Sequence, residues 1–160
     1  MNPGATYGLA KCWYPERFGE LGKRLVQKRN ASILLFGTAE EGSTAKKIVE
    51  HIKEGAIDLT GKTDLLHLAA ILERCQILVT NDTGTLHVAA AVGTPVVAIF
   101  GPTDPDTTGP WGEGHAIVKK EVPCGPCLKR VCPTDHACMK NIGVEDVEEA
   151  IVNRLRSMER

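Results

Sequence analysis

The segment from Val79 to Pro105, VTNDTGTLHVAAAVGTPVVAIFGPTDP, constrains the fold of this chain more than any other. An apolar stretch ends at Asn81, an alanine-rich stretch of helical character follows, and a second apolar stretch ends before Gly101. A strand, a helix and a strand in this order form a crossover unit, whose two strands run parallel. The segment therefore predicts a parallel sheet with a helix packed on it.

The rest of the chain continues this alternation. Apolar runs and helical periodicity predict strands over 32–36, 56–59, 76–80, 95–100 and 116–119, and helices over 15–29, 40–54, 64–74, 85–92 and 144–158. The expected fold is α/β, a Rossmann-like parallel sheet with flanking helices. The chain opens on the loop Pro3-Gly4-Ala5, with no strand before it. We expect the missing first strand to leave a sheet edge or groove unfilled, which favours marginal stability or self-association.

Length and composition limit the remaining possibilities. The 160 residues suit a single domain, 1–160, which includes a Cys-rich loop at 121–141 and the helix at 144–158. The net charge of −1 gives no reason to expect a nucleic-acid partner. The most apolar stretch, 88–101, is too short to span a bilayer, and no signal peptide is visible. We expect a cytoplasmic protein without a transmembrane segment, and peripheral attachment to the inner membrane stays open.

The hinge at Asn81–Gly84 lies at the carboxyl end of a predicted strand, where parallel sheets bind their ligands. The helix that follows offers free backbone N–H groups for a phosphate, and Gly84 would allow a close approach. Thr83 and Thr85 could add hydroxyl donors, and Asp82 could accept hydrogen bonds from sugar hydroxyls. The simpler alternative is that Asp82 or Thr83 only caps the helix. Spacing alone leaves both interpretations open.

Two basic side chains could join this site. Lys11 lies in a Gly-containing loop before the first helix, and His87 lies one turn into the hinge helix. The alternatives are a solvated lysine and a half-buried helix histidine. The Gly61-Lys62-Thr63 sequence is not a P-loop, because five residues instead of four separate Gly55 from Gly61. Thr63 is instead expected to cap the next helix.

Several of these segments together resemble glycosyltransferase family 9, the ADP-heptose:lipopolysaccharide heptosyltransferases, and within it the heptosyltransferase II branch. The resemblance rests on NPGATYGLAKCWYPERFGEL at 2–21, LLFGTAEE at 34–41, the stretch 59–105, and the Cys-rich segment. Its most specific part is D-T-G-x-x-H-x-A-A-A followed by P-x-V-x-x-F-G-P-T-D-P, from Asp82 to Pro105.

The resemblance implies a GT-B fold, in which two Rossmann-like halves face each other across a cleft. This chain resembles the C-terminal, donor-binding half, without the N-terminal acceptor domain. The expected donor is ADP-heptose, and the expected acceptor, the lipopolysaccharide inner core, would be bound through the missing half. The family inverts the anomeric centre and uses no D-x-D metal motif, and none occurs here. We therefore expect no required cofactor.

The resemblance also assigns site residues. Thr6 and Lys11 are expected near the donor phosphates, and Lys11 would stabilise the departing ADP. An acidic residue after the second strand of the domain, here the strand predicted over 32–36, would contact the ribose, with Glu40 as first choice and Glu41 as second. The catalytic base belongs to the missing half, so we expect donor binding without complete catalytic machinery. The donor-binding residues expected in the hinge and its helix are Asp82, Thr83, Gly84, Thr85 and His87.

The Cys-rich segment raises the question of a metal. Cys124 and Cys127 form a C-x-x-C pair, Cys132 and Cys138 complete four thiols, and His136 could substitute for one of them. Such ligands suit zinc, but the spacing is irregular, so free thiols remain an alternative. A non-catalytic zinc module on a Rossmann-like scaffold is therefore a second functional hypothesis. A family 9 transferase with a different sugar specificity is a third.

Overall fold

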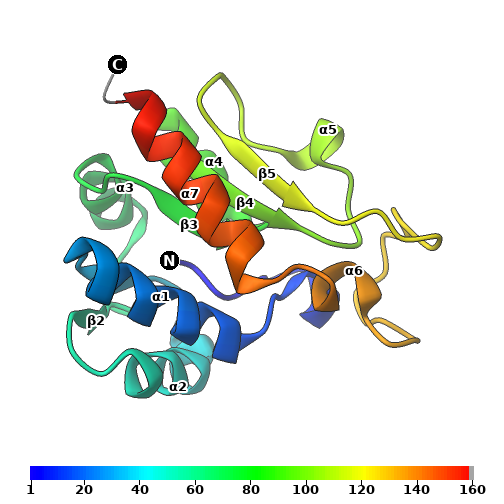
Figure 1. Ribbon diagram of the computed structural model, residues 1–160, viewed down its shortest axis with the longest axis horizontal. Helices are drawn as coiled ribbons and strands as arrows, with labels where there is room; N and C mark the ends of the chain where they lie inside the picture. The colour runs from blue at the N-terminus through cyan, green and yellow to red at the C-terminus, as the bar shows by residue number, and fades with distance from the viewer. Residues whose placement is uncertain (159–160) are drawn as a thin grey trace.

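A computed structural model of the protein describes residues 1–158, along which strands and helices alternate (Figure 1). The strands are β1 Ile33–Leu35, β2 Ala56–Asp58, β3 Leu78–Asn81, β4 Val96–Phe100 and β5 Ala116–Lys119. The α-helices are α1 Pro15–Arg29, α2 Gly42–Ile52, α3 Leu65–Glu73, α4 Gly84–Ala91, α5 Pro105–Thr108, α6 Ala137–Lys140 and α7 Val144–Met158, and the 3-10 turns are η1 Leu9–Lys11 and η2 Ala39–Glu41.

All strand pairs are parallel, which confirms the predicted fold class. β1 pairs with β2, and β4 lies between β3 and β5 in a second, three-stranded group. Within that group Val79 is paired with Val97, so that both strands end at the same edge of the sheet. The loops after β3 and β4 therefore meet at this edge.

The amino terminus lies between the two groups of strands, near the middle of the molecule (Figure 1). The Phe36 N–H donates to the Met1 carbonyl at 2.9 Å, the Asn2 N–H donates to the Val79 carbonyl at 2.9 Å, and Asn2 forms a parallel bridge with Thr80. The expectation of an opening loop beside an unfilled edge was wrong in this respect. Met1 and Asn2 occupy a strand position inside the sheet, between β1 and β3. Self-association stays a prediction.

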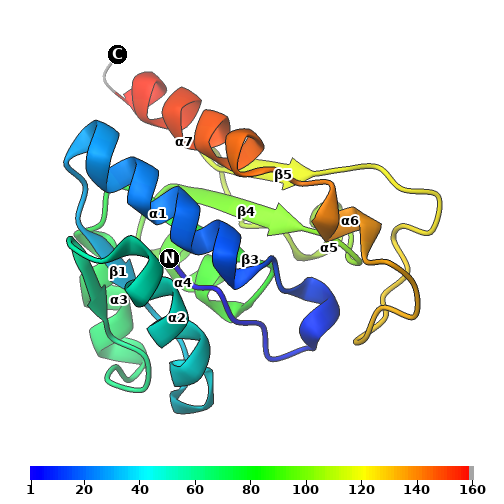
Figure 2. The same ribbon diagram turned by 60° about the horizontal axis from the view of Figure 1, so that its bottom comes forward.

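Helices cover both faces of the sheet (Figure 2). Val97 and Ile99 of β4 pack in a cluster with α1, α2 and α7, whereas the alternate residues of β4 pack with α3 and α4. Every residue of β4 is therefore buried, which explains why this strand reads as a continuous apolar run. Within residues 1–158, no helix is long and apolar enough to cross a membrane.

Some predicted boundaries need correction. The predicted helix at 40–54 divides into η2 and α2, because the Thr38 N–H donates to the Glu41 carboxylate and starts a separate turn. Asp64, and not Thr63, caps α3 by accepting the His67 N–H at 2.8 Å. Leu65, the first residue of α3, is 65% exposed.

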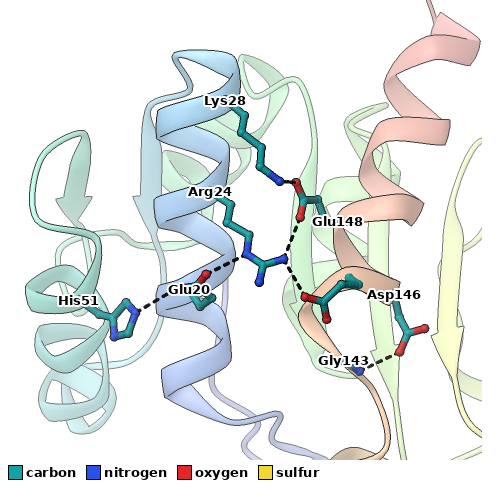
Figure 3. A network of polar contacts seen from close by, with 8 residues as sticks. Glu20, Arg24, Lys28, His51, Gly143, Asp146 and Glu148 are labelled. Carbon is teal, nitrogen blue, oxygen red and sulfur yellow. Dashed lines mark hydrogen bonds and ion pairs between the residues drawn. The ribbon is translucent and has the colours of Figure 1, made fainter.

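Charged side chains join α1 to α7 on the outside of the sheet (Figure 3). The Arg24 guanidinium donates to Glu145 at 2.8 Å and to Glu148 at 3.2 Å, both on α7. It also donates to Glu20 on its own helix at 2.8 Å. The bond from Arg24 is the main cause of the lowered pKa of Glu20. The bonds from Arg24 to Glu145 and Glu148 hold the two helices side by side.

Candidate donor-binding site

Asn81, the last residue of β3, fixes the loop that leads from the amino terminus to α1. Its amide group donates to the Pro3 carbonyl at 2.6 Å and accepts the Trp13 N–H at 3.0 Å. Asn81 is fully buried, so these bonds have no competition from water. The sequence placed Asn81 in the hinge but assigned it no role. A polar amide that ends an apolar strand was the available signal.

A cavity of about 500 Å³ lies where β1, α3 and α4 meet at the carboxyl edge of the sheet. Thr6, Thr83 and Thr85, all predicted site residues, line it together with Glu41. Apolar side chains also line it, namely Phe36, Leu65 and Leu68. An apolar wall with a few polar groups is the usual lining of a small-molecule site.

The start of α4 is open to a ligand. Thr83 has the N-cap position, but its side chain makes no capping hydrogen bond. A Cβ atom added at Gly84 would meet no atom within 4 Å, and Gly84 has no positive φ. Neither crowding within the protein nor backbone conformation therefore requires a glycine here. Free space beside backbone N–H groups of a helix start suits an anion.

Asp82 does not cap this helix with its side chain. Its Oδ2 atom accepts the Lys11 ammonium at 2.5 Å, the Thr103 hydroxyl at 2.6 Å and the Thr108 hydroxyl at 3.0 Å. The Lys11 Nζ atom also lies 4.7 Å from the centre of the Tyr7 ring. Lys11 is 7% exposed, so the interpretation as a solvated loop lysine was wrong. Removing one partner of such a buried pair leaves the other charge uncompensated.

Glu41, rather than Glu40, lies at the cavity. Its carboxylate accepts the Thr38 N–H at 2.7 Å and lies directly against two glycines. A Cβ atom at Gly4 would be 1.5 Å from Glu41 Oε1, and one at Gly37 would be 2.5 Å from Oε2. Glu40 is exposed and is not among the residues that line the cavity. The geometry therefore favours the second choice made from the sequence.

The remaining predicted residue of the hinge helix, His87, is exposed on α4. It is also not among the residues that line the cavity. The structure thus gathers Thr6, Thr83 and Thr85 around the cavity. It joins Lys11 to Asp82 in a buried pair, and neither of these two residues is among those that line the cavity. It leaves His87 outside.

The Cys-rich segment packs against the loop that carries Lys11. The Ala10 N–H donates to the Arg130 carbonyl at 3.0 Å, and the His136 ring contacts the Ala10 carbonyl at 2.8 Å and the Tyr14 hydroxyl at 3.4 Å. Both ring nitrogens of His136 thus already have hydrogen-bond contacts within the protein. Over residues 1–158, no three or more His, Cys, Asp or Glu side chains are arranged to share a metal ion. The geometry gives the zinc hypothesis no support.

A parallel α/β sheet with a partly polar cavity at the carboxyl ends of its strands defines a Rossmann-like ligand-binding unit. The family can also be stated. Residues 1–138 match the model of glycosyltransferase family 9 (heptosyltransferase), and the chain belongs to this family.

Individual relatives agree with this assignment. The chain is 34% identical, over 98% of its length, to lipooligosaccharide heptosyltransferase 2 of Campylobacter jejuni, and 33% identical, over 73% of its length, to lipopolysaccharide heptosyltransferase 2 of Escherichia coli K12. Among solved structures, E. coli ADP-heptose lps heptosyltransferase II matches 99% of the chain with a TM-score of 0.84 and 28% identity. A family 9 glycosyl transferase from Veillonella parvula matches 98% with a TM-score of 0.83 and 27% identity.

These matches confirm the predicted likeness to heptosyltransferase II and to part of a GT-B enzyme. The chain spans about half the length of its relatives: 50% of the C. jejuni protein and 46% of the E. coli structure.

Proposed function

We propose that this chain is the C-terminal, donor-binding half of a heptosyltransferase, and that its cavity binds the donor ADP-heptose. The observation that carries the proposal is the cavity itself, which combines an apolar wall, an acidic side chain and the open start of α4. The relatives supply the chemical class, because they carry the name heptosyltransferase and one structure is described as an ADP-heptose enzyme.

Each part of such a donor has a suitable partner in the cavity. Phe36, Leu65 and Leu68 offer apolar surface for the base. Glu41 can accept hydrogen bonds from ribose hydroxyls, since an ionised carboxylate has several free lone pairs. The hydroxyls of Thr83 and Thr85 and the backbone N–H groups of α4 suit the diphosphate.

The chemistry of transfer would be shared between two halves. Lys11 supplies positive charge where ADP departs, which stabilises the developing charge without any metal. The base that activates the acceptor hydroxyl, and the contacts to the lipopolysaccharide core, belong to the acceptor-binding half. We therefore expect this chain to bind the donor in the cytoplasm without a cofactor and without transferring heptose by itself.

Isothermal titration with ADP tests the proposal. We expect binding by the unaltered chain, and weaker binding after Lys11→Ala or Asp82→Asn. Lys46→Ala is the matched control, because Lys46 is an exposed lysine on α2, 3.9 Å from Glu50 and not among the residues that line the cavity. No heat of binding at millimolar ADP, in a folded protein, would refute the proposal.

The sugar is tested separately. If the cavity binds the sugar specifically, ADP-heptose and other ADP-sugars should compete with ADP to different degrees. Stronger competition by another ADP-sugar than by ADP-heptose would favour a family 9 transferase of different specificity. Elemental analysis after purification from metal-replete medium tests the zinc module: stoichiometric zinc without affinity for ADP would support that alternative.

A further inference from the structure

The Asp82 carboxylate is the centre of a buried polar cluster drawn from separate parts of the chain. Lys11 comes from η1, Thr103 from the loop after β4, and Thr108 from the end of α5. Asp82 and Thr103 are each 5% exposed. The sequence assigned no role to either threonine, and neither lines the cavity.

The hydrogen-bond geometry fixes the orientation of Asp82. A hydroxyl can donate one proton, and a carboxylate can only accept. Thr103 therefore donates to Oδ2, which also receives the Lys11 ammonium. Thr108 has two acceptors within reach, Oδ2 at 3.0 Å and the Asp104 carbonyl at 3.3 Å, and Oδ2 is the nearer and the charged one. Bonds to an ionised acceptor are stronger than bonds between neutral groups. Rotation of the carboxylate would break all of these bonds at once.

The same geometry leaves Lys11 able to bind a second anion. An ammonium has three N–H donors, and within residues 1–158 Lys11 makes a side-chain hydrogen bond to Asp82 alone. The Tyr7 ring lies 4.7 Å from the ammonium and adds a cation–π contact without using a donor in a hydrogen bond. Two donors remain, on a charge that is held in place.

We propose that Thr103 and Thr108 are positioning residues, which act through Asp82 to hold the Lys11 ammonium where the diphosphate of the nucleotide binds. The inference rests on the proposed function, since it names how the phosphate-binding charge of that site is oriented. Without the two hydroxyls, Asp82 keeps its charge but loses its fixed direction. Lys11 then spends part of its time away from the diphosphate.

Binding measurements with matched variants test the inference. The double variant Thr103→Val/Thr108→Val removes both hydroxyls at nearly constant shape, and Thr103→Ser/Thr108→Ser retains them. Thr107→Val, at an exposed neighbouring position, is the control. Titration with ADP and with adenosine separates the phosphate contribution from that of the nucleoside. We expect the valine pair to lower ADP affinity about tenfold and adenosine affinity less than twofold. The serine pair should bind ADP as the unaltered chain does.

A second measurement does not depend on the nucleotide. Because Lys11 is 7% exposed and its ammonium is paired with Asp82, we expect the ammonium protons to exchange slowly enough with water to give a ¹H–¹⁵N signal, which Lys11→Arg assigns. We expect this signal to vanish in the valine pair and to remain in the serine pair.

The outcomes separate the two proposals. An unaltered chain that does not bind ADP refutes the proposed function, while the ammonium signal still decides the role of the threonines. ADP binding within twofold of normal in the folded valine pair overturns the positioning role. So does a serine pair that is as defective as the valine pair, because the hydroxyls are then not the cause.

Discussion

Acidification should destabilise this protein through its amino terminus. The Met1 amino group is fully buried and donates to the Leu34 carbonyl at 2.6 Å, in the strand position between β1 and β3. Burial lowers its pKa from the ordinary value of 8.0 to about 5, although the nearby Cys75 acts in the opposite direction. The folded state therefore keeps a neutral amine at a pH at which the unfolded chain carries an ammonium.

The sign and size of the effect follow from linkage. Between pH 8 and pH 5 the unfolded state binds the proton and the folded state does not, so stability rises with pH. The stability is fully present above pH 8 and is lost as the pH falls towards 5. The change in pKa from 8.0 to about 5 corresponds to about 4 kcal/mol of unfolding free energy, at about 1.4 kcal/mol for each pH unit. A typical domain has only about 5–15 kcal/mol in total.

Urea denaturation from pH 8 to pH 5.5 measures this loss, and an Nα-acetylated chain is the control. Acetylation converts the amine into an amide, which keeps the N–H donor to Leu34 but cannot take up a proton. We expect the free chain to lose several kcal/mol more than the acetylated chain over this range. Carboxylates with lowered pKa values, such as Asp146 and Glu148, lose their contribution only at lower pH. Parallel curves for the two proteins would refute burial of the amino group within the sheet.

Two further predictions concern the loop that carries Lys11. Trp13→Phe removes the bond from the indole N–H to the Ile142 carbonyl at 2.9 Å, and we expect a loss of about 1–3 kcal/mol in urea denaturation. An unchanged midpoint would contradict the role of this bond. Gly4→Ala places a methyl group against the Glu41 carboxylate and should weaken ADP binding, whereas Gly42→Ala should not, since its nearest atom is 3.9 Å away. Equal affinities in both variants would show that Glu41 does not contact the nucleotide.

The fold was predictable wherever many residues repeat one signal. The sequence pattern predicted the bounds of α1 and β5. Helix α1 buries one face along its length, and the residues of strand β5 alternate between more buried and more exposed positions. The strand role of Met1 and Asn2 was not predictable, since two residues have no period and their partners lie at Phe36 and Val79. The short helices α5 and α6 were not predicted either, because four residues are too few to show a helical period.

The resemblance predicts a set of site residues but not the contacts between them. Resemblance named both Lys11 and Asp82, which are separated by 71 positions, yet a sequence motif does not say that their side chains meet. The resemblance also left open whether Glu40 or Glu41 is the acidic residue at the ribose. That choice depends on space beside Gly4 and Gly37, which only the folded backbone provides.

The place of Lys11 depends on residues that do not line the cavity. Asn81 holds the beginning and the end of its loop, Trp13 anchors the end to Ile142, and His136 contacts the Ala10 carbonyl beside it. The loop that carries Lys11 is therefore held in place by part of the Cys-rich segment and by the connection to α7. Since a misplacement of about 1 Å at a charged group can cost a large part of its effect, we expect substitutions at these supports to weaken the proposed binding of ADP as well as the fold. The segment thus supports the Lys11 loop through contacts that do not depend on a metal.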